Sequence, residues 1–305
     1  MAHLGARLYD DRVSIMTTPN RGTLLIAPAL AAAGMLLLAS CGGDGPPPIR
    51  TGTPAYYFQT AKEAYGKGDF AKATEWLDKI NKANKNEFSG RAWVFRLLLE
   101  TGSAAAYRDL AEYYEYGRRS NKDNPTPFIK KVTEYRGIAT RMTLPLGELY
   151  ASYETSGPEA ETVIDFPFPS TGTTTRPPQL TKISQGIAPT EDEARAALKG
   201  SLDRGIVLAI CNLVGAKEDA AKGRAALQTL PVKVPRAEFE LAMAKALYEA
   251  AQLHGAKFSG SPAVQEFLCQ QALKAFASVS DDSKETKALK ANIEKELKDA
   301  AKRKG

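Results

Sequence analysis

Residues 57–80 constrain the fold of this chain most, because their apolar side chains recur at the spacing of an α-helix. Halfway along this segment, the pair Gly68-Asp69 interrupts the pattern. Glycine relieves the turn that ends one helix, and aspartate caps the start of the next. Ala61 and Ala73 are small enough to let the two helices approach closely. The segment therefore predicts two short helices packed as a hairpin.

This hairpin pattern resembles the tetratricopeptide repeat, a family in which a Gly-Asp-aromatic turn joins two helices. The family's period of about 34 residues leads from Gly68 to Gly102, where a second turn is expected. A third hairpin is expected around Gly215, and a fourth over residues 244–279. The resemblance implies an α-solenoid whose first helices line a concave surface. A generic helical bundle with chance spacing of small residues stays open as the alternative.

The remaining segments complete an all-α layout. Residues 128–153 read as helical, with a break at Leu144-Pro145, because proline cannot donate a helix hydrogen bond. Residues 157–190 are rich in Pro and Thr and predict a long loop with a short extended piece at Val163-Ile164. Thr190 and Glu193 form a capping box that restarts the helical pattern.

The predicted fold class is thus all-α: tetratricopeptide-like helix-turn-helix repeats, a long Pro/Thr-rich insertion and a terminal capping helix. That last helix begins near Ser283 and carries one apolar stripe, which suits a solenoid cap. Its stripe consists of Leu289, Ile293 and Leu297. The predicted divisions are a signal peptide (1–40), an acylated tether (41–54), an N-terminal helical half (55–156), the insertion (157–190) and a C-terminal helical half (191–305).

The N-terminal region indicates where the protein is held. An apolar run ends at Leu38-Ala39-Ser40-Cys41, which resembles the lipobox of a bacterial lipoprotein. The run is shorter than the roughly 20 residues that span a membrane and suits a signal peptide. The resemblance implies cleavage between Ser40 and Cys41 and lipid on Cys41. Gly42, in place of the Asp that retains such proteins in the inner membrane, favours the outer membrane and a periplasm-facing body. Met16 is the expected start, with Met1 as the alternative.

Charge adds little to the functional prediction. Removing residues 1–40, which carry a net charge of +1, leaves +5 of the chain's +6. Residues 283–305 hold eight basic side chains against four acidic ones. Such a tail suits an anionic lipid or a nucleic acid, but a solvated helix with internal i,i+4 ion pairs is the simpler interpretation. We expect no nucleic-acid partner for an exported lipoprotein.

Catalytic and metal-binding patterns are missing from the sequence. His254 is the one histidine left after residue 40, and its place near a helix end suits a cap. Cys211 and Cys269 lie in apolar helical stretches; an oxidising compartment permits a disulfide between them, and burial as free thiols is the alternative. We therefore expect no enzyme activity, no metal and no cofactor apart from the lipid on Cys41.

Tyrosines offer candidate contacts for a partner. Tyr57, Tyr65, Tyr113 and Tyr116 combine contact area with a polar tip and either line a groove or belong to the repeat core. The function expected from the sequence is a membrane-anchored scaffold or adaptor that binds a protein or peptide. The alternative is an accessory lipoprotein of a transport system, which binds a small hydrophobic ligand or a solute-binding protein.

Overall fold

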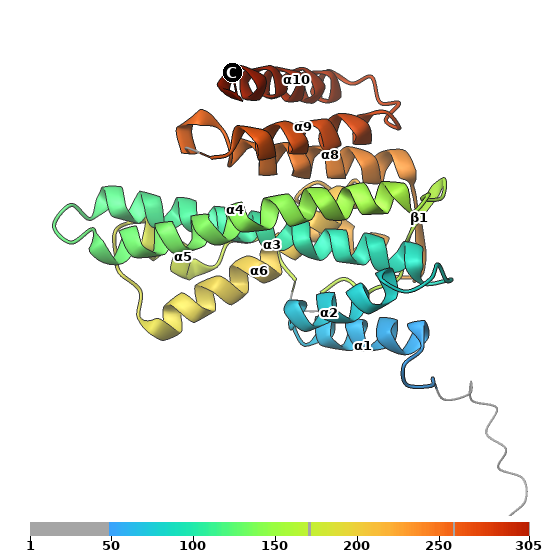
Figure 1. Cartoon of the computed structure of the whole chain (residues 1–305). Coiled ribbons are helices and arrows are strands. Elements are labelled where there is room, and N and C mark those ends of the chain that lie inside the picture. The colour runs from blue at the N-terminus through green and yellow to red at the C-terminus, as the bar shows by residue number, and fades with distance from the viewer. Residues whose placement is uncertain (1–48, 170–171, 259, 305) are drawn as a thin grey trace, which may run out of the picture. The chain divides into compact units, whose positions relative to one another are not determined.

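The computed structural model describes residues 49–169, 172–258 and 260–304, which form layers of α-helices and one short strand pair (Figure 1). The helices are α1 (Pro54–Gly66), α2 (Phe70–Asn81), α3 (Ser89–Ser120), α4 (Thr126–Thr155), α5 (Pro178–Ser184), α6 (Glu191–Leu213), α7 (Ala220–Ala226), α8 (Arg236–Gln252), α9 (Pro262–Phe276) and α10 (Lys284–Lys304). The strands are β1 (Glu161–Ile164) and β2 (Val232–Pro235). The all-α class predicted from the sequence is confirmed.

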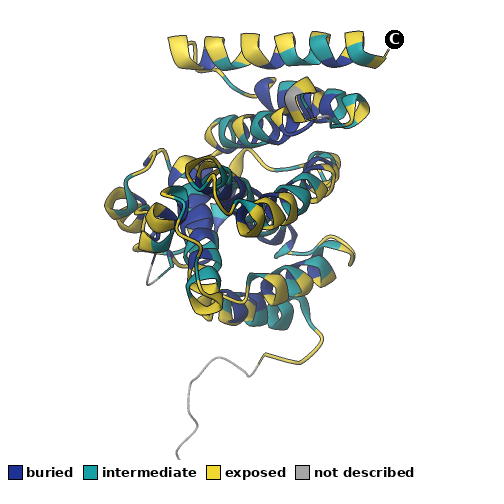
Figure 2. Ribbon diagram, turned by 90° about the vertical axis from the view of Figure 1, so that its left-hand side faces the viewer, coloured by how far each residue is buried: buried dark blue, intermediate teal, exposed yellow. Residues whose placement is uncertain are grey.

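Consecutive helices pack in pairs, and the pairs are stacked. The pairs α1–α2, α3–α4 and α8–α9 follow one another, and α10 lies on α9 as the outermost layer (Figures 1 and 2). The helix α6 does not continue this series, because it packs along α3. The described residues from Ile49 onward form one compact unit, so the two predicted helical halves share one hydrophobic core.

The first predicted hairpin is present in detail. Gly68 has a φ of +75°, which favours glycine, and it joins α1 to α2. The Oδ1 atom of Asp69 accepts a hydrogen bond from the backbone N–H of Lys72 at 3.0 Å and so caps α2. Ala61 and Ala73 are fully buried. Later in the chain, Gly215 also adopts a positive φ, after the end of α6.

Two predicted interruptions are wrong. Gly102 was expected in a turn but lies inside the continuous helix α3, where its missing side chain admits α6. Pro145 was expected to break a helix but lies inside α4. Residues on both sides of Pro145, including Ala139 and Tyr150, are fully buried against other elements. Their burial offsets the lost hydrogen bond, because tertiary packing rather than local preference supplies most helix stability in proteins.

The segment 157–190 is packed rather than a plain long loop. The extended piece expected at Val163-Ile164 is confirmed as β1, which pairs antiparallel with β2 so that Val163 lies opposite Lys233. Phe166 is buried, and its ring stacks on that of Phe95 with centroids 4.0 Å apart. The helix α5 was not predicted. This segment therefore contributes to the core that it was expected to interrupt.

At both ends of the C-terminal region, the structure agrees with the features predicted from the sequence. Thr190 and Glu193 form the predicted capping box, with bonds of 3.0 and 3.2 Å between each side chain and the other residue's backbone N–H. The predicted terminal helix is α10, and Ile293 on its apolar stripe is fully buried. Leu289 and Leu297 pack beside it. A single apolar stripe thus attaches α10 to the stack.

The crossing of α3 and α6 brings two backbones into contact. A Cβ atom added to Gly205 would lie 2.1 Å from the carbonyl oxygen of Gly102. A Cβ atom added to Gly102 would lie 2.7 Å from the Cα atom of Ile206. Real Cβ atoms do not approach backbone atoms so closely, so both glycines are required by this crossing.

We predict that Gly205→Ala lowers the free energy of unfolding by at least about 2 kcal/mol, because α3 and α6 must separate to admit the methyl group. Urea unfolding measures this change. Gly90→Ala is the matched control, because Gly90 also lies in α3 but has no atom within 4 Å of the added Cβ. The control should keep or slightly raise stability, since alanine is the better helix former. Equal effects of the two substitutions would contradict the crossing.

Candidate binding groove

Three adjoining clefts run along the half-exposed side of α8, and together they are called the α8 groove here. The first, about 550 Å³, lies between α8, α3 and α6. The second, about 630 Å³, lies between α8, α10 and residues 212–217. The third, about 830 Å³, lies between the end of α8, α3 and α10. Glu249 lines all three clefts, so they form one continuous feature.

Small side chains create the space of the first cleft. Helical residues normally fill the room beside their own backbone with side-chain atoms, and alanine and glycine leave that room open. Those that line the first cleft are Gly102, Ala105, Gly205, Ala209, Ala242 and Ala246. They come from three helices that the α3–α6 crossing and the stacking of α8 hold in place. Two of them, Gly102 and Gly205, are also the residues that let α3 and α6 approach.

The second cleft has an apolar wall. Val214, Leu241, Tyr248 and Leu289 line it and are each half-buried. Pockets for small ligands and for peptide side chains typically combine such apolar surface with a few polar groups. The polar groups here include Lys217 and Lys245, which line both the first and second clefts. Among the described residues, neither lysine has an ion-pair partner.

The backbone at Lys217 is unusual. Its φ of 55° is the one positive value at a non-glycine residue in the described part of the chain. A left-handed conformation costs a side-chain-bearing residue about 1 kcal/mol. The short link between α6 and α7 holds Lys217 in this conformation at the rim shared by two clefts.

Two ion pairs fix the walls of the groove. The Nη1 atom of Arg204, on α6, donates to Oδ2 of Asp109 on α3 at 2.7 Å, and its Nε donates to the carbonyl oxygen of Thr174 at 2.9 Å. The Nη1 atom of Arg108, on α3, donates to Oε2 of Glu249 on α8 at 2.9 Å. The side chain of Arg204 is only 10% exposed, so its pairing is largely shielded from solvent. These contacts connect α3 with α6 and α8.

The four tyrosines proposed as groove residues lie in two separate places. Tyr57 and Tyr65 are on α1: Tyr65 is buried in the core, and Tyr57 stacks on Trp76 with ring centroids 5.7 Å apart. Tyr113 and Tyr116 are near the end of α3, with centroids 6.2 Å apart, and Tyr116 is 50% exposed. None of the four lines the three described clefts of the α8 groove. Of the four, Tyr116 offers the most surface to a partner.

The two cysteines of the described part are free and buried, Cys211 in α6 and Cys269 in α9. The disulfide considered from the sequence is therefore not formed in the structure. Burial, with a smaller effect of Asp219, raises the pKa of Cys211 to about 11. Burial and Glu296 raise the pKa of Cys269 to about 12. Both thiols stay protonated at neutral pH and serve as small apolar side chains. The predicted lipidation and cleavage site, Ser40 and Cys41, lies outside the described residues.

His254 is buried at the end of α8, close to the position expected for a helix cap. Its Nε2 atom lies 2.7 Å from Oγ1 of Thr143, and its Nδ1 atom accepts the backbone N–H of Ser261 at 3.3 Å. Burial and then the charge of Arg303 lower its pKa. The lowered pKa favours the neutral form of the ring, which connects α4 to the start of α9. These contacts give the ring a structural role.

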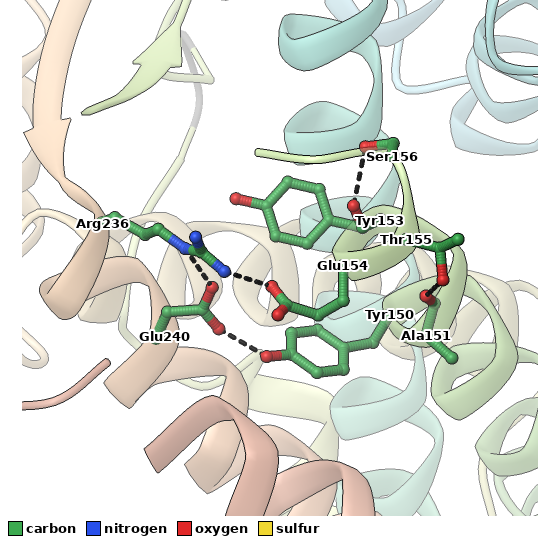
Figure 3. A network of polar contacts seen from close by, with 8 residues as sticks. All are labelled: Tyr150, Ala151, Tyr153, Glu154, Thr155, Ser156, Arg236 and Glu240. Atoms are coloured by element: carbon green, nitrogen blue, oxygen red, sulfur yellow. Dashed lines mark hydrogen bonds and ion pairs between the residues drawn. The ribbon is translucent and has the colours of Figure 1, made fainter. Parts of the chain in front are cut away.

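A partly buried polar network joins α4 to α8 (Figure 3). The hydroxyl of Tyr150 donates to Oε2 of Glu240 at 2.6 Å. Arg236 donates through Nε to Oε1 of Glu240 at 3.0 Å and through Nη2 to Oε1 of Glu154 at 2.7 Å. Burial, reinforced by the Glu154 carboxylate, raises the pKa of Glu240, while the bonds from Tyr150 and Arg236 act against the rise. One arginine thus serves two carboxyl groups.

This network contains the residue types of an acid–base site, but a ligand in the α8 groove does not reach its central carboxyl group, Glu240. The side chain of Glu240 is fully buried, and no residue of the network lines the clefts of the α8 groove. Perturbed carboxyl groups also occur in structural networks. We therefore interpret the network as the polar joint between α4 and α8.

The described residues contain no group of three or more His, Cys, Asp or Glu side chains that is able to hold a metal ion. Over the same residues, no helix is long and apolar enough to cross a membrane. Comparison of the chain with protein-family models, curated proteins and solved structures gave no match.

The groove residues were not singled out from the sequence. Arg108, Asp109, Arg204 and Glu249 come from three helices that are far apart in the chain. One available signal was a charged residue inside an otherwise apolar helical stretch, as at Arg204 just before residues 205–211. A lone buried charge is costly, so such a position implies an oppositely charged partner. Which partner it is cannot be read from one helix.

We predict that wild-type protein loses stability as the pH rises above about 4.5, the ordinary pKa of a glutamate, because the folded state then holds a proton on Glu240 that the unfolded chain releases. The loss continues until the pH passes the raised pKa of Glu240 in the folded state. Urea unfolding over a pH series should show this slope in wild type and a flatter one in Glu240→Gln. Glu238→Gln, at an exposed position of the same helix, should keep the wild-type slope. Parallel curves for wild type and E240Q would contradict this assignment.

Proposed function

We propose that this protein is a membrane-anchored adaptor that carries lipid on Cys41 and binds a segment of a partner protein in the α8 groove, without catalysis. The observation that supports this most is the groove itself: a continuous feature with small residues, an apolar wall and exposed charges. Protein-binding surfaces use apolar anchors in pockets for affinity and polar rims for specificity.

A helical segment is the form of partner that suits the groove. The chain's own helix α6 packs along α3, where Gly102 and Ala106 lie four residues apart and contact Gly205. The same spacing of small residues recurs on α8 at Ala242 and Ala246, which line the open first cleft. We infer that a partner helix packs on α8 much as α6 packs on α3, a helix-in-groove mode of recognition.

Stacked helix pairs with a terminal single helix suit a tetratricopeptide-like solenoid, as do the turn at Gly68 and the cap at Asp69. The long α3 and the crossing helix α6 depart from the regular repeat. We propose a degenerate solenoid in which α6 occupies part of the surface that the first helices of the repeats would otherwise present.

The proposed location is the outer membrane, with the body facing the periplasm. It rests on the lipobox-like residues 38–41 and on Gly42 after the cysteine. Residues 42–54 contain Gly42, Gly43, Gly45, Gly52 and four prolines, which suits a tether. Such a tether would confine the groove to partners near the membrane surface.

A second candidate function rests on the second cleft alone. Its volume of about 630 Å³ and its apolar wall fall in the range of sites for small molecules. An accessory protein of a transport system that binds a small hydrophobic ligand would use this cleft, with Lys217 or Lys245 near a polar end of the ligand.

We predict that wild-type protein in its host incorporates labelled palmitate and stays in the membrane fraction, and that Cys41→Ser loses both properties. Cys211→Ala is the matched control and should keep the label, because that thiol is buried in α6. Labelling of C41S would contradict the lipid assignment, as would an unlabelled wild-type protein.

We predict that a photoreactive phenylalanine derivative in place of Tyr248 crosslinks in vivo to a discrete partner protein, because Tyr248 lines the apolar wall of the groove. The same group in place of Tyr116, exposed near the end of α3, should not give this adduct. Ala242→Trp, which fills the groove, should abolish the adduct at Tyr248 while circular dichroism stays unchanged.

The other outcomes of this crosslinking experiment separate the proposals. An adduct at Tyr116 but not at Tyr248 would place the binding surface outside the groove. An adduct at Tyr248 with a small apolar molecule instead of a protein would favour the second candidate. No adduct at either position would contradict the adaptor function.

A further inference from the structure

The outer side of α10 is strongly basic. Of the residues of α10 that are exposed, seven are lysines and two are glutamates, Glu285 and Glu294. The exposed lysines are Lys284, Lys287, Lys290, Lys295, Lys298, Lys302 and Lys304. The buried side of the helix carries Leu289, Ile293 and Ala300, so most of these charges lie on the side away from α9. Lys304 is the exception, because its Nζ atom pairs with Glu266 of α9. Because α10 is the outermost layer, no other described element covers that side (Figures 1 and 2).

Four of these lysines form a row, called the lysine row here: Lys284, Lys287, Lys295 and Lys298. At 100° per residue they fall within a narrow sector of the helix, on the side opposite Ile293. Lys302 falls at the angle of Lys284 but is left out of the row, because it lines the third cleft of the α8 groove. None of the four lysines of the row lines the clefts of the α8 groove. A row of like charges repels itself, which disfavours the isolated helix. An anionic surface would relieve this repulsion.

Carboxylates of the chain neutralise the lysine row only weakly. The Nζ atom of Lys287 lies 3.6 Å from Oδ1 of Asp282, and both side chains are largely exposed, at 65% and 93%. Exposed pairs of this kind contribute little. Within the described part of the chain, Lys284, Lys295 and Lys298 have no ion-pair partner. Three of the four charges are thus available to an external anion.

The residue types distinguish between anionic partners. Nucleic-acid surfaces interleave basic side chains with aromatic rings or with arginines that bind phosphates in bidentate fashion. The lysine row has neither: α10 contains no aromatic residue, and its one arginine, Arg303, turns inward to the carbonyl oxygen of His254. Flexible ammonium groups along a straight helix suit a diffuse layer of anionic headgroups.

We propose that the lysine row of α10 binds the surface of a membrane that contains anionic phospholipid. The interaction is electrostatic and superficial, since the outer side of α10 offers alanines between the lysines, such as Ala288 and Ala291, and no large apolar side chain for insertion. The membrane contact and the α8 groove use different residues. The proposal therefore does not depend on the proposed groove function or on the lipid on Cys41.

The test is vesicle co-sedimentation with residues 49–305, the unit that has its own hydrophobic core. This unit lacks Cys41 and the apolar run before it, so any binding comes from the folded body. The vesicles contain phosphatidylcholine alone or mixed with phosphatidylglycerol. Wild type should bind the mixed vesicles and not the neutral ones. Binding should disappear at high salt, because the Debye length falls from about 10 Å at 0.1 M to about 3 Å at 1 M.

The decisive variant replaces the four lysines of the row with glutamine. Each basic residue near an anionic surface contributes about 1 kcal/mol, so the apparent partition coefficient should fall by on the order of 100-fold or more. The matched control is K82Q/K122Q/K130Q/K199Q, which removes the same charge from exposed positions scattered over other elements. The control should lose less than about tenfold, because its lysines form no common row. Circular dichroism checks that both variants fold.

Three results would overturn the proposal. These are equal binding of wild type to neutral and anionic vesicles, a loss of binding in the control as large as in the row variant, and binding of the row variant as tight as that of wild type. A fluorescent single-stranded oligonucleotide is tested alongside. Binding of the oligonucleotide without binding of anionic vesicles would show that the row serves a nucleic acid, and would also overturn the proposal.

Discussion

The backbone contact between α3 and α6 determines the rest of the arrangement. Because Gly102 and Gly205 have no side chains, α6 lies directly on α3 where a regular stack would leave that surface open. This contact places Arg204 beside Asp109 and positions the end of α6 next to α8. The first cleft exists because α6 covers α3 but does not cover the neighbouring side of α8. A larger residue at either glycine would therefore alter the core and the groove together.

The polar joints keep these layers in register. Apolar contact between helices tolerates sliding, whereas a charged pair in a partly buried setting has one favourable geometry. Arg108 connects α3 to Glu249 on α8, and Arg236 connects α8 to Glu154 on α4. The helix α8 is therefore held from two sides by charge while its groove side stays open. A binding surface needs such a fixed scaffold. If its wall were mobile, ordering that wall on binding would cost free energy and weaken the affinity for the ligand.

The sequence predicted the structure correctly where the interacting residues lie close together in the chain. The turn at Gly68, the cap at Asp69 and the box of Thr190 and Glu193 involve residues within a few positions of each other, and all are present. The stripe on α10 was equally clear, because one helix face packs on one neighbour. Helix class and much of the hairpin pattern could therefore be predicted.

The failures have a common physical cause, which is that a residue's role depended on a distant partner. Glycine is a common turn residue, but Gly102 lies at a helix crossing. Its partner there, Gly205, is about a hundred residues away in the chain. The extended piece at Val163-Ile164 was predicted, but its pairing with β2 was not, because Val163 and its partner Lys233 are about seventy residues apart. The α8 groove draws its walls from α3, α6, α8 and α10, so no single segment carries its pattern.

The division of charge on α10 connects the two proposed surfaces. Glu285, Glu296 and Asp299 line the clefts of the α8 groove together with Lys302 and Arg303, whereas the lysine row lies on the outer side of the helix. The groove side of α10 thus carries charges of both signs, and the row on its outer side is basic. Ligands at the two surfaces would not compete for the same side chains, so membrane contact would leave the groove open. The helices α1 and α10 lie at opposite ends of the stack (Figure 1). Membrane contact through the lysine row would therefore set the orientation of the groove relative to the membrane from the α10 end and not from the α1 end.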